Sequence, residues 1–170
     1  MKNISWNKQK IIFILIIAAI IVGDQIAKYF AQTVLPGEPG KSAEFIDGFM
    51  RFIYTENTGA AFSLFGGATW ILAIISGVMA VVVIVLLFKT KDIDSWLCKL
   101  GLCFIAGGAI GNLLDRVFRG YVVDMMEFEF VDFAVFNVAD CFVTFGAVMV
   151  CIFIIWYWEK SRKKQDVQED

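Results

Sequence analysis

Carboxylate side chains are the groups with which this sequence could do hydrolytic chemistry. The chain has no histidine, which excludes a Ser-His-Asp triad and a histidine-bound metal. A serine-lysine pair would have to combine Ser63 with Lys28, and no local motif supports that pairing. Two acids that share a site remain, because one can hold a proton as general acid while the other activates water as general base. Such a pair titrates as a unit and requires neither a metal nor a cofactor.

Asp124 and Asp140 have sequence surroundings that favour opposite protonation states. Asp140 lies near the start of a predicted helix, whose dipole favours an ionised acid. Asp124 follows the apolar run Tyr-Val-Val, which favours a protonated acid. We therefore expect Asp140 to be the easier of the two acids to ionise.

The composition indicates that helices in a membrane must position these acids. Hydrophobic residues make up 59% of the 170 residues, charged residues make up 19%, and the mean hydropathy is +0.71. A bilayer core of about 30 Å needs about 20 helical residues. Four segments approach that length, at about 11–33, 65–88, 96–115 and 136–158. We predict an all-α membrane protein with four transmembrane helices in a single domain, residues 1–170.

Basic residues predict how the helices are oriented. Ten of the fifteen Lys and Arg residues lie before the first helix, between the second helix and the first turn of the third, or in the basic tail at 159–170. All three segments fall on one side of a four-pass chain, and short connections rich in Lys and Arg stay in the cytoplasm. Both termini are therefore predicted to be cytoplasmic. The net charge of -2 and the scattered basic residues give no basis for nucleic-acid binding.

Two longer connections are predicted on the outer side. The segment at about 40–62 contains turn signals and a β-favouring run at 49–55, which predicts a small β element. The segment at 116–135 alternates acids with phenylalanines and is interpreted as an interfacial helix or loop. In this interpretation the acids face water, and the phenylalanines face lipid or pack in a core.

Counting along the helices places the polar residues in one layer. Asp24 and Asn112 each lie about 20 Å from the inner surface, and Asp140 lies about 28 Å from it. The same outer layer contains nine polar residues: Asp24, Lys28, Asn57, Asn112, Asp115, Arg116, Asp124, Asn137 and Asp140. Ionisable groups are costly at such depths, so the cluster predicts a functional site near the outer leaflet. The inner ends are predicted to carry only solvated charges.

Members of this layer also have structural explanations. Asp24 and Lys28 are four residues apart on one helix face and could neutralise each other. Asn137 could cap the fourth helix, with Asp140 at its N3 position. The Asp-Arg pair at 115–116 could anchor a helix at the interface, and the nearby glycines could form a packing surface.

Five sequence blocks resemble those of the bacterial lipoprotein signal peptidase family, or signal peptidase II. They are DQIAK at 24–28, NTGAAFS at 57–63, GGAIGNLLDR at 107–116, VVD at 122–124 and FNVAD at 136–140. They occur in the family's order, with similar spacing, over most of the chain. The resemblance implies a four-helix aspartic endopeptidase of the bacterial inner membrane that cuts a diacylglyceryl-modified prolipoprotein before its lipidated cysteine.

The resemblance also implies roles for individual residues. Asp124 and Asp140 match the catalytic pair. Further residues match positions that bind the substrate backbone or support the pair: Asn57, Gly59, Asn112, Asp115, Arg116, Asn137, Asp24 and Lys28. The implied partners are the prolipoprotein, membrane lipid and inhibitors of the globomycin type, and we expect a monomer. Met125 and Met126 depart from the family, whose members often have Phe and an aliphatic residue there, which bears on substrate preference.

Two other classes of protein would also collect polar residues in a membrane. A transporter or channel subunit should have polar residues along a path through the bilayer, and the inner halves of the second and fourth helices have almost none. A structural or assembly protein could use the glycines and charged pairs for helix docking alone. Cleavage of a lipidated prolipoprotein distinguishes a peptidase from both.

Overall fold

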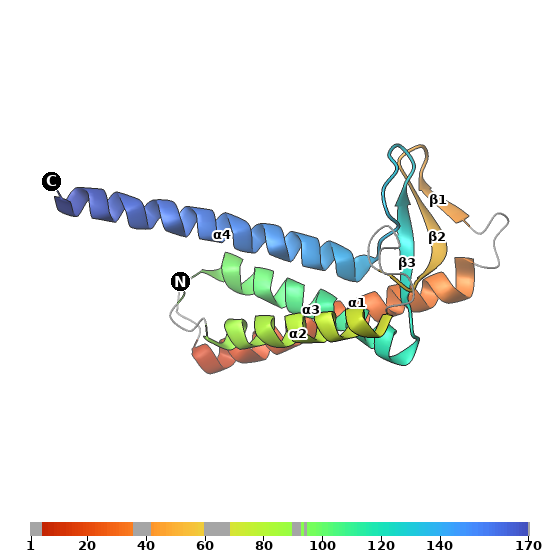
Figure 1. Ribbon diagram of the computed structural model, residues 1–170, viewed down its shortest axis with the longest axis horizontal. Helices are drawn as coiled ribbons and strands as arrows, with labels where there is room; N and C mark the ends of the chain where they lie inside the picture. Colours follow the sequence, from red (N-terminus) through yellow and green to blue (C-terminus); the bar gives the residue numbers. More distant parts are fainter. Residues whose placement is uncertain (1–4, 36–41, 60–68, 90–92, 94, 170) are drawn as a thin grey trace.

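Four long helices and one small sheet make up the part of the chain that the computed structural model describes, residues 5–35, 42–59, 69–89, 93 and 95–169 (Figure 1). The helices are α1 (Trp6–Val34), α2 (Thr69–Lys89), α3 (Trp96–Phe118) and α4 (Val138–Glu169). The strands are β1 (Ser42–Ile46), β2 (Met50–Asn57) and β3 (Val122–Phe128). All four helices are long and apolar enough to cross a membrane, which confirms the predicted fold class.

Several helices extend beyond their predicted bounds. α1 already begins at Trp6, and α3 continues to Phe118, so Arg116 lies in its last turn. α4 runs on to Glu169, so most of the basic tail continues the helix and projects past the other helices at the end opposite the sheet (Figure 1). Its Lys, Arg, Glu and Gln residues are good helix formers. The predicted start of the second helix at 65 lies outside the described residues.

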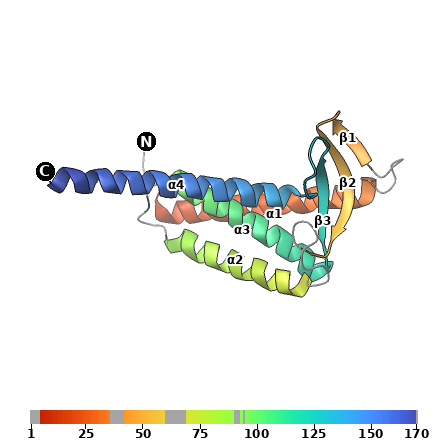
Figure 2. The ribbon, with the colours of Figure 1, turned by 45° about the horizontal axis from the view of Figure 1, so that its top comes forward.

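α3 is the central helix of the bundle and packs against the other three (Figure 2). In its apolar span 56% of the residues are buried, against 17% in each of the other three spans. Glycines allow this close packing. A Cβ atom added to Gly108 would lie 2.4 Å from the Ala139 carbonyl oxygen, and one added to Gly146 would lie 2.6 Å from the Gly101 oxygen. The glycines of α3 are therefore packing surface, as one of the structural explanations supposed.

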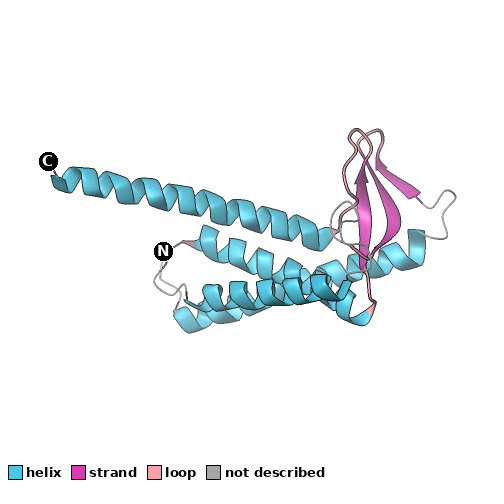
Figure 3. Cartoon of the chain, viewed as in Figure 1, coloured by secondary structure: helices cyan, strands magenta, loops and turns pink. Residues whose placement is uncertain are grey.

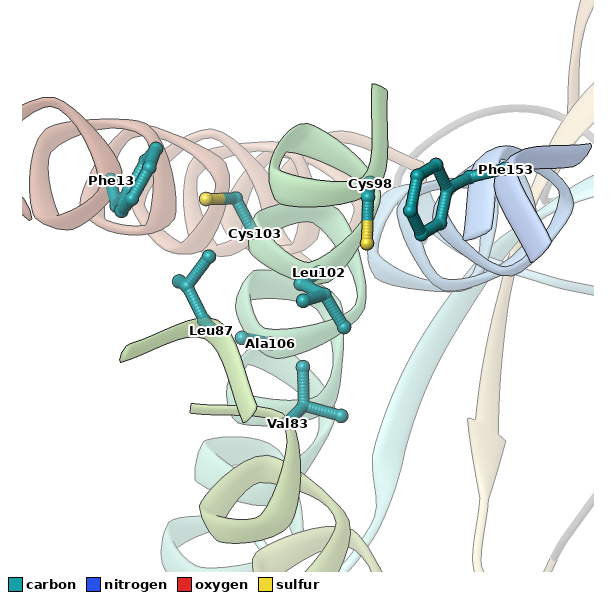
Figure 4. Close-up of a cluster of buried hydrophobic side chains, with 8 residues drawn as sticks. All are labelled: Phe13, Val83, Leu87, Cys98, Leu102, Cys103, Ala106 and Phe153. Carbon is teal, nitrogen blue, oxygen red and sulfur yellow. The ribbon is translucent and has the colours of Figure 1, made fainter. Parts of the chain in front are cut away.

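A hydrophobic cluster joins all four helices away from the sheet (Figure 4). Its buried members are Phe13, Val83, Leu87, Cys98, Leu102, Cys103, Ala106 and Phe153. α3 contributes four of these side chains, and each of them is small or of medium size. The cluster fixes α3 between its neighbours, while the polar residues occupy the opposite end of the same helix.

Lys99 is buried, so the prediction that the inner ends carry only solvated charges is wrong at this position. Only 4% of Lys99 is exposed. Its Nζ donates a hydrogen bond to Gln9 Oε1 at 3.0 Å and lies 5.3 Å from the centre of the Trp6 ring. The ring and the amide offset part of the cost of burying the ammonium group. The contact joins α1 and α3 across 90 residues, which the spacing of the sequence does not show.

The three strands form an antiparallel sheet in the order β1-β2-β3 at the end opposite the chain termini (Figures 1 and 3). β1 and β2 confirm the predicted β element. β3 was not predicted, because 122–128 was assigned to the interfacial helix or loop; of that segment, 129–135 is irregular. The acid-phenylalanine alternation begins only at Glu127, near the end of β3, so it does not mark the strand. Gly120, with φ of 81°, turns the chain from α3 into β3, a conformation that favours glycine.

Candidate active site

A pocket of about 440 Å³ lies between the sheet and the nearby ends of α3 and α4. Its polar lining includes five residues predicted from the sequence: Asn57, Asn112, Arg116, Asp124 and Asp140. Thr144 also lines it and was not predicted. Its remaining lining is mostly apolar and includes Phe128, Phe133, Phe136 and Phe145. A pocket of this size with a few convergent polar groups is the usual form of a small-ligand site.

Asp124 is held in β3, where it pairs with Thr55 of β2 and is only 3% exposed. Both of its carboxylate oxygens accept hydrogen bonds, Oδ1 from Asn137 Nδ2 at 2.6 Å and Oδ2 from Asn57 Nδ2 at 2.8 Å. Burial raises the pKa of Asp124 to about 6, and the charge of Asp140 acts in the same direction. The two amide donors lower the pKa but do not offset burial.

Asp140 lies in the first turn of α4 and forms a reciprocal cap with Asn137. The Asn137 backbone N–H donates to Asp140 Oδ2 at 3.1 Å, and the Asp140 backbone N–H donates to Asn137 Oδ1 at 3.0 Å. The other Asp140 oxygen accepts a hydrogen bond from Asn112 Nδ2 at 2.8 Å. The predicted structural role of Asn137 is therefore present, and it orients Asp140 toward the pocket.

Asn137 links the two acids directly. Its side chain is fully buried, its Oδ1 caps α4, and its Nδ2 donates to Asp124. The same Nδ2 lies 3.2 Å from Asn112 Oδ1. The Asn137 side chain therefore caps α4 and contacts Asp124 at the same time.

Asn57 is oriented by the turn that follows it. The Gly59 backbone N–H donates to Asn57 Oδ1 at 2.9 Å, which leaves the Asn57 Nδ2 group facing Asp124. This gives Gly59 a supporting place in the site. The rest of that motif, 60–63 with Ser63, lies outside the described residues.

Asp24, Lys28 and Asp115 form an ion cluster next to the pocket, and all three side chains are fully buried. Lys28 Nζ lies 2.8 Å from Asp24 Oδ2, 2.9 Å from Asp115 Oδ2 and 3.0 Å from Asn112 Oδ1. These three acceptors match the three ammonium protons. Asp24 and Lys28 do neutralise each other, while Asp115 is not an interfacial anchor because it is buried.

Arg116 brings an incompletely satisfied guanidinium group to the pocket. Its Nη1 lies 3.4 Å from Ser76 Oγ and 3.4 Å from Asn112 O. Its buried Nε has no hydrogen-bond partner among the described residues. A buried N–H without a partner is rare, and this one belongs to a residue that lines the pocket.

Besides Thr144, three contributors were missed from the sequence. Gln25 and Arg119 join the ion cluster, and Ser76 contacts Arg116 from α2. Arg119 follows Asp115 by four residues, so helix spacing could have identified that pair. No local signal connects Ser76 to Arg116, because the contact depends on how α2 packs against α3.

Known proteins resemble this chain both in sequence and in fold. A sequence model of the signal peptidase (SPase) II family matches residues 16–157. The chain belongs to the signal peptidase II family. This confirms the resemblance, and the chain is a peptidase with four membrane-spanning helices, of a family found in bacterial membranes.

Relatives of this signal peptidase II chain match over nearly their whole length. The lipoprotein signal peptidase of Enterococcus faecalis is 41% identical over 151 residues, 88% of this chain and 91% of the relative. That of Lactobacillus gasseri is 35% identical over 153 residues, 90% and 97% respectively. Two solved structures of a bacterial membrane enzyme are similar, each at 29% identity, with TM-scores of 0.75 and 0.73. They cover 84% of this chain, and 87% and 91% of their own.

Proposed function

We propose that this peptidase removes the signal peptide from diacylglyceryl-modified prolipoproteins by cutting before the lipidated cysteine, with Asp124 and Asp140 as the catalytic pair. The observation that carries the proposal is that both acids line one pocket and are joined through Asn137. Relatives named lipoprotein signal peptidase support the substrate class.

The proposed reaction uses one proton shared by the pair. Asp140 accepts a proton from water as the water oxygen attacks the scissile carbonyl carbon, and protonated Asp124 donates its proton to the carbonyl oxygen. The tetrahedral diol then collapses: Asp124 regains a proton from a hydroxyl group, and Asp140 passes its proton to the leaving nitrogen. The products are a signal peptide with a free carboxyl group and a lipidated cysteine with a free amine.

Residues around the pair fit the binding of an extended peptide. Arg116 Nε, which has no partner among the described residues, can donate to a substrate carbonyl oxygen. The phenylalanines that line the pocket can contact the apolar signal helix or the acyl chains. Asn112 holds Asp140 and accepts from Lys28, which is a supporting role.

The topology proposed from the basic residues places this chemistry near the outer leaflet, with both termini in the cytoplasm. A substrate anchored by its signal helix and acyl chains would present its scissile bond at that level. Membrane lipid surrounds the helices in this proposal, an inhibitor of the globomycin type would occupy the same pocket, and the chain acts as a monomer.

The test is cleavage of a lipidated prolipoprotein by the purified protein in lipid vesicles. Asp124→Asn and Asp140→Asn are each expected to lower kcat by about 1,000-fold or more, since each removes one half of a unit. Asp132→Asn, an exposed acid of the nearby loop, is the matched control and should retain wild-type activity. Full activity in either pocket variant, or no activity in the wild type with a correct substrate, contradicts the proposal.

A further inference from the structure

We propose that Arg119 and Gln25 are positioning residues for the catalytic pair. They act through two buried carboxylates and do not touch substrate, since neither residue lines the pocket. The inference rests on the proposed roles of Asp124 and Asp140.

Arg119 completes the charge balance of the ion cluster. Asp24 and Asp115 carry two formal negative charges, Lys28 carries one positive charge, and all three side chains have no exposed surface. Arg119 Nη1 donates to Asp115 Oδ1 from the C-terminal end of α3, and 26% of its side chain is exposed. The cluster is formally neutral with Arg119 and carries one buried negative charge without it. Uncompensated buried charge is strongly unfavourable.

Arg119 also fixes the orientation of Gln25. Arg119 Nη1 donates to Gln25 Oε1 at 2.9 Å, so the amide nitrogen of Gln25 is directed to the acids. That nitrogen lies 3.0 Å from Asp115 Oδ1 and 3.3 Å from both Asp24 Oδ2 and the Gly111 carbonyl oxygen. Gln25 therefore bridges the two carboxylates and the backbone of α3.

The carboxylates of Asp115 and Asp24 also accept hydrogen bonds from backbone N–H groups next to the catalytic acids. Asp115 Oδ2 accepts a hydrogen bond from the Val123 N–H at 3.2 Å, one residue before Asp124. Asp24 Oδ1 accepts a hydrogen bond from the Ala139 N–H at 2.9 Å, one residue before Asp140.

A rotation of either carboxylate would therefore release β3 or the start of α4 and move one catalytic acid relative to the other. Arg119 and Gln25 restrain both rotations from outside the pocket. Because small displacements of reacting groups are costly, these two residues affect the chemical step and not the binding of substrate.

The experiment measures kcat and KM for a lipidated prolipoprotein between pH 5 and 9 in wild type, Arg119→Gln, Arg119→Lys and Gln25→Met. Arg119→Gln is expected to lower kcat by about tenfold or more with KM changed by less than about twofold. It should also move the alkaline limb of the pH profile to higher pH, because the added net negative charge favours protonated Asp124. Arg119→Lys keeps the charge and should recover most of kcat.

Gln25→Met separates position from charge. It removes the bridge without changing the net charge, so kcat should fall while the alkaline limb stays where it is in wild type. Arg162→Gln, an exposed arginine of α4, is the matched control and should behave as wild type. Arg119→Lys and Gln25→Met also keep the proposal testable if Arg119→Gln does not fold.

The positioning role is overturned if Gln25→Met has the wild-type kcat and folded Arg119→Gln either has the wild-type kcat or shows no shift of its alkaline limb. An equal rise in KM in place of the fall in kcat does the same. Asp124→Asn and Asp140→Asn are assayed alongside: if both are inactive, the proposed function stands whatever the positioning variants do. If either remains active, the proposed function itself has failed.

Discussion

At the residue scale, backbone N–H groups decide which way the two key amides point. The N–H of Gly59 occupies Asn57 Oδ1, and the N–H of Asp140 occupies Asn137 Oδ1. Each amide is left with its Nδ2 group facing Asp124, which therefore receives a donor on each oxygen. The local turn and the helix start thus determine the hydrogen bonding of the buried acid.

Asn137→Ser should separate the capping role from the catalytic role. A serine hydroxyl can cap α4 and an alanine cannot, so Asn137→Ala should be about 1 kcal/mol less stable than Asn137→Ser. Both variants lack the Nδ2 donor to Asp124, so both should lower kcat by about tenfold to a hundredfold. Thermal unfolding and cleavage assays check this, and wild-type kcat in Asn137→Ser would show that the amide serves only as a cap.

The pH dependence of cleavage should report the protonation of Asp124. Burial raises its pKa to about 6, so in the free enzyme Asp124 holds a proton below that pH and loses it above. We expect kcat/KM to fall as the pH rises through about 6. The alkaline limb of kcat should lie at higher pH, because bound substrate excludes more water from the acid. If kcat/KM instead rises steadily between pH 5 and 8, protonated Asp124 is not the form required for cleavage.

At the scale of elements, glycines on α3 set how close α4 can come and hence where the first turn of α4, which carries Asp140, lies. An added Cβ on Gly108 meets the Ala139 carbonyl oxygen at 2.4 Å and the Val143 side chain at 2.7 Å. Ala139 directly precedes Asp140 and is held by Asp24. Helix packing and site geometry are therefore coupled through one turn of α4.

Gly108→Ala should push that turn away from α3. We expect a loss of about 1–3 kcal/mol in the free energy of unfolding and a clear loss of cleavage, since overpacking at a backbone contact has to move the helix. Gly23→Ala is the matched control, because a Cβ there meets nothing within 4 Å and alanine favours a helix. Thermal unfolding of both variants in detergent tests this, and equal stability would show that α3 and α4 tolerate the extra volume.

Elements with local signals could be predicted, and contacts across the chain could not. Apolar length identified the four helices, and the three-residue spacing of Asn137 and Asp140 indicated a helix cap. β3 was missed because its partner in β2 lies about 70 residues earlier and because the acid-phenylalanine run that drew attention begins only at its end. The link from Lys28 to Asp115 spans α1 and α3, so only the packed structure shows it.

At the scale of the whole molecule, apolar and ionic stabilisation occupy different ends of the helix bundle. The cluster around Phe13 and Leu87 packs away from the sheet, and the ion cluster around Lys28 lies beside it. The sheet brings two site residues together, since β2 carries Asn57 and the neighbouring strand β3 carries Asp124. Because the ion cluster is buried beside the pocket, we expect the pocket to depend on charge balance inside the bundle.

Removing Lys28 should show how much that balance matters. Lys28→Met leaves two buried carboxylates with one arginine and should cost about 3–5 kcal/mol of stability. Lys28→Met combined with Asp24→Asn restores neutrality and should be more stable than Lys28→Met alone. Unfolding measurements on the single and double variants check this order, and a double variant less stable than the single one would mean that specific bonds outweigh net charge.

A double-mutant cycle on the two pocket acids tests the central claim most directly. Single-turnover cleavage of a lipidated prolipoprotein is measured for wild type, Asp124→Asn, Asp140→Asn and the variant with both changes. Because the acids are proposed to act on one proton as a unit, the double variant should be no slower than the slower single variant. Losses that multiply, or a single variant that cleaves at the wild-type rate, would contradict a shared catalytic role.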